Sequence, residues 1–176
     1  MKRHIITGTP GAGKTCLIRF LESKGYGVVE ESATDVIDLE NALGVIEPWT
    51  NPEFIDKIVS LQRQRQITTS AVSKLQFFDR SPICTYALSV YLSMQPSQTL
   101  MAEVNRIKQE KIYQKKVFFI ENLGFCKPSE ARKISFEDSL RFEKIHEEVY
   151  KSNGFECIRI APKSISERVN EILSLS

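Results

Sequence analysis

The sequence predicts an α/β fold, a parallel sheet with helices on both faces. Short apolar or β-branched runs alternate with segments of helical periodicity along all 176 residues. This alternation is typical of parallel sheets because neighbouring parallel strands are joined by crossover helices. Residues 117–120 are continuously apolar, as expected of a strand buried on both faces. No repeat or linker divides the chain, so we expect a single domain spanning residues 1–176.

In the N-terminal half, strands and helices alternate before a longer helix. The predicted elements are a strand over 3–7, a helix over 14–24, a strand over 26–30, a helix over 32–43 and a helix starting at Asn51-Pro52. Gly25 stands where a left-handed cap ends the first helix. Asn51 favours an N-cap and Pro52 the first helical position, so the pair predicts a helix start. Residues 62–66 of this helix are wholly polar.

The C-terminal half repeats the alternation. Its predicted elements are a strand over 75–79, helices over 82–92 and 97–113, a strand over 117–120, a helix from Ser135 to Gly154, a strand over 155–160 and a last helix from Ser164. Ser135 with Asp138, and Ser164 with Glu167, have the spacing of a capping box. Right-handed crossovers between parallel strands then limit the possible topologies.

Composition limits the partners that the chain can have. The net charge of +2 is too small to favour a nucleic-acid surface or an anionic membrane. No run of about 18 apolar residues is present, and the N-terminus lacks a secretory apolar region. The four cysteines form no CxxC pair for zinc or redox chemistry. We therefore expect a cytoplasmic protein, monomeric or homodimeric, without nucleic-acid or membrane partners.

The string GTPGAGKT, Gly8 to Thr15, matches the pattern GxxxxGK[ST] of a phosphate-binding loop. It lies between the first predicted strand and the first predicted helix, as the motif requires. The glycines allow the backbone N–H groups to approach the phosphates, and the helix N-terminus favours negative charge. Lys14 would reach the β- and γ-phosphates, and the Thr15 hydroxyl would bind Mg²⁺. The predicted nucleotide-binding residues are Gly8, Thr9, Gly11, Ala12, Gly13, Lys14, Thr15 and Cys16.

Acidic residues follow the predicted strands at the edge where ligands bind in open parallel sheets. Asp79 ends an apolar strand as a Mg²⁺-binding acid would, although Glu121 offers a competing arrangement. Glu30 and Glu31 are adjacent, and we expect Glu31 to face the cleft. A surface acid that favours the next helix dipole is the alternative for either of them.

A basic segment between the fourth strand and its helix could cover the phosphates as a lid over residues 123–135. A solvated loop is the alternative interpretation. Arg63 and Arg65, at the polar end of the third helix, are interpreted as solvated.

Together the strings GTPGAGKT, GYGVVEESA, FFDRSP and GFECIRIAP resemble the kinase-like group of P-loop proteins. This group includes the nicotinamide riboside kinase domain and AAA-type ATP-binding proteins and, more distantly, deoxynucleoside and thymidylate kinases. The resemblance implies a three-layer α/β/α P-loop NTPase with strand order 2-3-1-4-5. It also implies catalytic roles for Lys14, Glu31, Asp79 and Arg80, and a phosphate clamp at Arg132 with Arg141 as the weaker candidate.

Two functions follow from these residues. The first is a small-molecule kinase that transfers the γ-phosphoryl group of Mg-ATP to a nucleoside- or nucleotide-like acceptor. The second is an ATPase or switch protein that acts on a protein partner without an acceptor. ATP is expected because no NKxD or DxxG string is present, although GTP stays possible. The kinase requires an acceptor pocket, which Trp49 and residues 62–66 could line.

Overall fold

A five-stranded parallel sheet forms the centre of the protein in this computed structural model, which describes residues 1–8, 10–69, 73–122 and 135–176. The strands are β1 (Lys2–Thr7), β2 (Gly27–Val29), β3 (Leu75–Asp79), β4 (Lys116–Ile120) and β5 (Glu156–Ile160). Their order is β2-β3-β1-β4-β5, and all neighbouring strands run parallel. The predicted fold class and strand order are confirmed.

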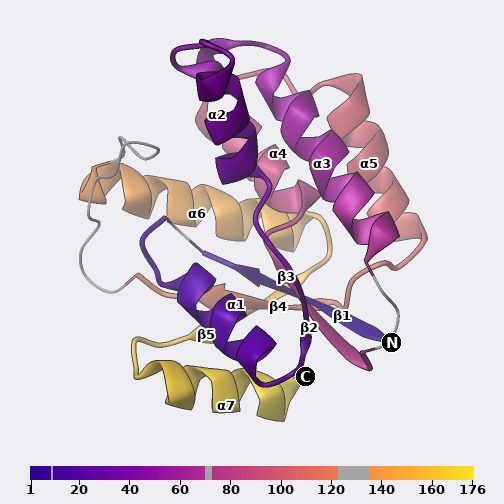
Figure 1. Ribbon diagram of the computed structural model, residues 1–176, viewed down its shortest axis with the longest axis vertical. Helices are drawn as coiled ribbons and strands as arrows, with labels where there is room; N and C mark the ends of the chain where they lie inside the picture. Colours follow the sequence, from indigo (N-terminus) through magenta and orange to yellow (C-terminus); the bar gives the residue numbers. More distant parts are fainter. Residues whose placement is uncertain (9, 70–72, 123–134) are drawn as a thin grey trace.

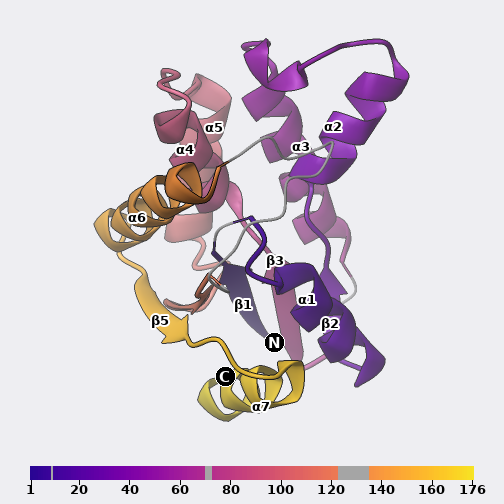
Figure 2. The same cartoon turned by 90° about the vertical axis from the view of Figure 1, so that its left-hand side faces the viewer.

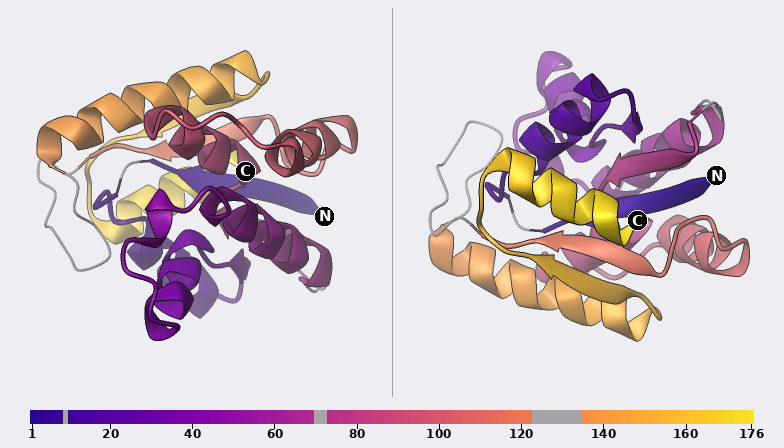
Figure 3. Two further views of the ribbon diagram at one scale, coloured as in Figure 1. Left: turned by 90° about the horizontal axis from the view of Figure 1, so that it is seen from above. Right: turned by 90° about the horizontal axis from the view of Figure 1, so that it is seen from below.

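Helices cover both faces of the sheet (Figure 1). They are α1 (Lys14–Ser23), α2 (Ala33–Ala42), α3 (Phe54–Thr68), α4 (Pro82–Tyr91), α5 (Gln98–Gln109), α6 (Phe136–Ser152) and α7 (Ile165–Leu175), with a short 3₁₀ helix, η1 (Pro48–Thr50). Helices α1 and α7 lie together on one face, as Figure 3 shows from below. The other helices lie on the opposite face, which gives three layers.

The alternation of side chains along the strands builds two cores. Ile5 belongs to the core under α3, α4, α5 and α6, whereas Ile6 belongs to the core under α1 and α7. Phe78 and Phe77 divide between the two cores in the same way. Successive residues of a strand point to opposite faces, so a strand buried on both faces is apolar throughout.

Two helix boundaries differ from the prediction. The helix predicted over 97–113 ends at Gln109, and Lys111 turns the chain out of it with a φ of 50°. Ile112 and Tyr113 still pack against the core from the connection to β4, which explains why their apolar character extended the predicted helix. The helix predicted to start at Asn51-Pro52 starts at Phe54 instead. The Asn51 side chain accepts a hydrogen bond from the Glu53 N–H in the turn before it, at 2.9 Å.

The connections that follow β1, β2 and β3 leave the sheet at the same end of these parallel strands (Figure 2). They carry the predicted loop from Gly8 to Thr15 and the residues Glu31 and Arg80. No helix within the described ranges is both long and apolar enough to cross a lipid bilayer.

Candidate functional site

The predicted phosphate loop connects β1 to α1. Gly11 and Gly13 have φ angles of 85° and 84°, a left-handed conformation that glycine adopts without steric cost. Gly13 occupies the N-cap of α1, and no side chain caps the first turn there. The first N–H groups of a helix need acceptors, so an uncapped N-terminus suits an anion. Lys14 is buried, whereas Thr15 and Cys16 are exposed.

Glu31 and Arg80 form an ion pair between the ends of β2 and β3. Thr34 donates a further hydrogen bond to the Glu31 carboxylate at 2.9 Å. Arg80 has a φ of 72°, which is uncommon for a residue other than glycine, and its N–H bonds to the Ile6 carbonyl at 3.0 Å. Strained backbone of this kind is often found at functional sites. Glu30 is exposed, and it lines one of the two cavities that Glu31 lines.

Lys14 and Arg80 bring positive charge to this edge of the sheet, beside the carboxylates of Glu31 and Asp79. Burial alone would lower the pKa of the Arg80 guanidinium, but Glu31, with Cys84 and Asp79, raises that pKa above its ordinary value. His146 of α6 is fully buried, and burial together with Arg80 and Lys14 holds its pKa well below the ordinary value. His146 is therefore neutral at physiological pH.

Thr15, Glu31 and Asp79 line one cavity of about 200 Å³ beside α1. Hydroxyl and carboxylate oxygens are the ligands that Mg²⁺ prefers, usually with only one or two from the protein and others from phosphate. The oxygen atoms that line this cavity therefore suit the predicted ion. Glu121 instead forms an ion pair with Arg159 of β5 at 3.2 Å, which favours Asp79 over Glu121.

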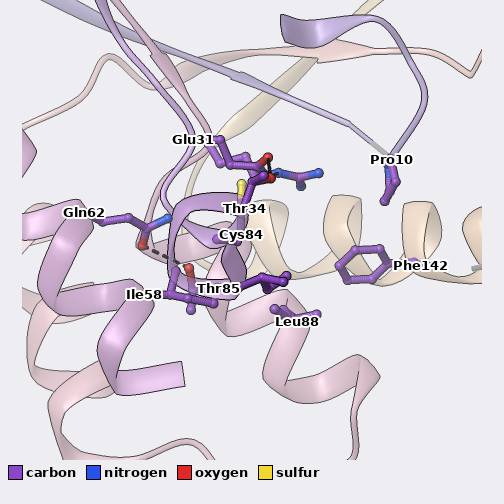
Figure 4. A pocket seen from close by; sticks show the side chains of 12 residues that line it. Pro10, Glu31, Thr34, Ile58, Gln62, Cys84, Thr85, Leu88 and Phe142 are labelled. Carbon is purple, nitrogen blue, oxygen red and sulfur yellow. Dashed lines mark hydrogen bonds and ion pairs between the residues drawn. The ribbon is translucent and has the colours of Figure 1, made fainter. Parts of the chain in front are cut away.

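A second cavity of about 150 Å³ opens between the phosphate loop and the helices of the larger core. Figure 4 shows Glu31 and Gln62 on one side of it, and Pro10 and Phe142 on the other. Its other lining residues are Ala33, Thr34, Ile37, Ile58, Arg80, Cys84, Thr85 and Leu88. The cavity is thus mostly apolar, with Glu31 and Arg80 on its boundary.

Gln62 gives this cavity a directed polar group. The Thr85 hydroxyl donates to the Gln62 side-chain oxygen at 2.9 Å, and both residues are buried. With its oxygen held in this way, Gln62 keeps its amide N–H donors for other partners. Of the residues predicted to line an acceptor pocket, Gln62 lines this cavity, whereas Trp49 packs against the larger core.

The interpretation of Arg65 as a solvated residue is wrong. It lies on α3 and donates to the carbonyls of Glu30 and Glu31, at 3.2 and 2.7 Å, and pairs with Asp35. It thereby ties α3 to the turn that carries Glu31. Gln62, in the same polar segment, is buried because it lies four residues after the buried Ile58. That helical spacing was the available signal.

Arg168 is a further residue that the sequence did not suggest. It stands among the apolar residues of α7, between Ile165 and Ile172, and reaches the phosphate loop. Thr9 and Arg132, and almost all of the predicted lid over 123–135, lie outside the described residues. The alternative clamp, Arg141, is exposed on α6 with its guanidinium 5.9 Å from the centre of the Tyr91 ring.

A family model described as an AAA domain matches residues 3–168. The chain belongs to this AAA domain family. The match covers every predicted strand and all of the loop between Gly8 and Thr15. No curated protein matches the chain.

Solved structures of this fold include three informative neighbours. A NadR protein in complex with NAD and AMP-PNP matches with a TM-score of 0.69 and 14% identity over 99% of this chain and 48% of its own. Deoxyadenosine kinase from M. mycoides has a TM-score of 0.61 and 16% identity, with 98% and 97% covered. Thymidylate kinase from Ehrlichia chaffeensis has a TM-score of 0.61 and 16% identity, with 99% of both chains covered. These likenesses establish the kinase-like P-loop fold.

Proposed function

We propose that this protein is a small-molecule kinase that transfers the γ-phosphoryl group of Mg-ATP to a nucleoside- or nucleotide-like hydroxyl. The observation that supports a kinase is the apolar cavity beside the phosphate loop, with Glu31 and Arg80 at its boundary. A kinase needs an acceptor pocket next to the phosphates, whereas a nucleotide switch needs none. The deoxyadenosine and thymidylate kinases among the structural neighbours point to the same class of acceptor.

In the proposed reaction, the acceptor hydroxyl oxygen bonds to the γ-phosphorus while the bond from that phosphorus to the β–γ bridging oxygen breaks. ADP leaves with the electron pair, and the hydroxyl proton passes to Glu31. Lys14 and Arg80 neutralise charge on the phosphoryl oxygens, with Arg132 of the lid as a third cation. Bound Mg²⁺, held by Thr15 and Asp79, would supply further charge neutralisation.

The Glu31–Arg80 ion pair has a defined part in this scheme. Glu31 would accept the proton as a carboxylate, and in the structure this carboxylate pairs with the Arg80 guanidinium. The same guanidinium lines the cavity, where it would meet an incoming phosphoryl group. Gln62, oriented by Thr85, would donate hydrogen bonds to a carbonyl or ring nitrogen at the far end of the acceptor.

The experiment measures ADP release from Mg-ATP with and without deoxyadenosine, thymidine, dTMP or nicotinamide riboside. We expect one of these acceptors to raise turnover above the acceptor-free rate. Glu31→Gln should then lower the stimulated turnover by about 10²–10⁴-fold while leaving Mg-ATP affinity within about twofold. Lys14→Ala serves as the control for the loop and should lose nucleotide binding.

Two results would count against the kinase. Slow hydrolysis that no acceptor stimulates would favour the ATPase or switch alternative. Unchanged stimulated turnover in the Glu31→Gln protein would remove Glu31 from the proton transfer.

A further inference from the structure

Arg168 of α7 packs against the back of the phosphate loop, 156 residues away in sequence. Its side chain is buried, with a fractional exposure of only 3% for the residue. One guanidinium nitrogen, Nη1, donates to the Ala12 carbonyl at 3.1 Å. The other, Nη2, lies 3.3 Å from the point where a Cβ on Gly13 would stand. The guanidinium therefore contacts the loop at the Ala12–Gly13 peptide.

This contact has a direct consequence for the geometry of the loop. In a trans peptide the carbonyl and the following N–H point in opposite directions. No peptide of the described structure is cis. Because the Ala12 carbonyl points toward Arg168, the Gly13 N–H points away from α7, to the opposite side of the loop. A donor bound to the carbonyl also polarises the peptide, which makes the N–H a better donor to an anion.

The charge of Arg168 has no counterion in the part of the chain that the structure describes. No carboxylate forms an ion pair with it there, and its Nε has no hydrogen-bond acceptor. By contrast, the guanidinium groups of Arg65, Arg80 and Arg106 each pair with a carboxylate. Burial lowers the pKa of Arg168, and Cys16 offsets this only in part. An uncompensated buried charge destabilises the folded chain, so an arginine here requires another explanation.

We propose that Arg168 is a positioning residue of the phosphate site, whose charge is compensated when nucleotide phosphates occupy the loop. It holds the Ala12–Gly13 peptide with its N–H directed toward the phosphates, and it adds a fixed positive charge behind the loop. Occupancy of the loop is thereby coupled to α7. This inference rests on the proposed nucleotide binding, and it holds for a kinase and for a switch protein alike.

The test compares Arg168→Met and Arg168→Lys with the wild-type protein in two measurements. Titration calorimetry with Mg-ATP measures affinity, and urea denaturation without nucleotide measures stability. We expect Arg168→Met to bind Mg-ATP at least tenfold more weakly, while its urea midpoint stays equal or rises because a buried charge has been removed. Arg168→Lys should recover part of the affinity, since it restores the charge without the planar fork of donors.

Arg106→Met is the matched control, because Arg106 pairs with Glu103 and Glu110 on α5. It should lower the urea midpoint and leave Mg-ATP affinity unchanged. A purely structural Arg168 would behave like this control, and that result would overturn the inference. Wild-type protein that takes up no Mg-ATP would refute the proposed nucleotide site itself. If the wild-type and Arg168→Met proteins bind Mg-ATP equally well, only the role of Arg168 is refuted.

Discussion

Gly8 lies where the phosphate loop leaves β1, at a point that has no space for a side chain. Its φ is 130°, and a Cβ built there would stand 2.3 Å from the Ile120 carbonyl oxygen. The obstacle is backbone at the end of the neighbouring strand β4, which cannot rotate away. The glycine that the motif requires is thus needed for strand packing as well as for phosphate approach.

Gly8→Ala should therefore lower the free energy of unfolding by about 3 kcal/mol or more, because overpacking adds to backbone strain. Urea denaturation measures this loss. Gly44→Ala is the control, since Gly44 has a φ of 85° but nothing within 4 Å of its missing Cβ. It should lower the free energy of unfolding by only about 1–2 kcal/mol, which is the cost of a left-handed backbone for a residue that has a Cβ. Equal losses in the two proteins would show that the contact with Ile120 does not decide the effect.

Helix α3 connects the acceptor cavity to the turn that carries Glu31. Gln62 lines the cavity, and Arg65, one turn later, bonds to the carbonyls of Glu30 and Glu31. Helix α3 therefore supports both the Gln62 side of the cavity and the turn that carries Glu31. Sites held by helices and strands keep their geometry better than sites held by loops alone.

Arg65→Met should loosen this turn, because it removes hydrogen bonds in which the donor is charged. We expect amide hydrogen exchange in residues 30–35 to accelerate about tenfold, while exchange in β1 and β4 stays unchanged. Arg63→Met is the matched control on the same helix, since about half of the Arg63 side chain is exposed and its ion pair with Glu103 is long, at 3.5 Å. Similar protection of residues 30–35 in both variants would argue against a positioning role for Arg65.

The stability of the whole molecule should depend on His4, which is buried in the middle of the sheet. Its ring lies 5.7 Å from the Phe77 ring and 5.5 Å from the Phe118 ring, measured between centroids. Neither ring nitrogen has a hydrogen-bond partner in the described structure. Burial, with Lys2 and Lys116, lowers the pKa of His4 from 6.5 to about 4. The folded protein therefore holds a neutral His4 at a pH where the unfolded chain is already protonated.

This difference makes acid destabilising. As the pH falls below 6.5, His4 becomes protonated in the unfolded chain but stays neutral in the folded protein, so the free energy of unfolding falls. This fall levels off near pH 4, where folded His4 is protonated as well. Between pH 7 and pH 5 the free energy of unfolding should fall by about 2 kcal/mol more in the wild-type protein than in His4→Phe. Chemical denaturation of both proteins at the two pH values measures the difference. Parallel losses would show that His4 is not the group responsible.

At the scale of the whole molecule, much of the fold could be predicted because its signals are local. Alternating apolar runs predicted five strands and the helices between them, and a contiguous string predicted the phosphate loop. Errors occurred where tertiary packing outweighed local pattern. Ile112 packs from a connection although its spacing is helical, and Arg65 binds carbonyls although its neighbours in sequence are polar.

By itself the sequence determined the α/β class, the position of the phosphate loop and the strand ends at which acidic residues gather, since all of these depend on residues close together in the chain. Only the tertiary structure decided which side chains meet. Glu31 and Arg80 are 49 residues apart, and Arg168 reaches Ala12 from the last helix. The first pair depends on the pairing of β2 with β3, and the second on how α7 packs against the sheet. Both arise from contacts between distant segments, which no local periodicity records.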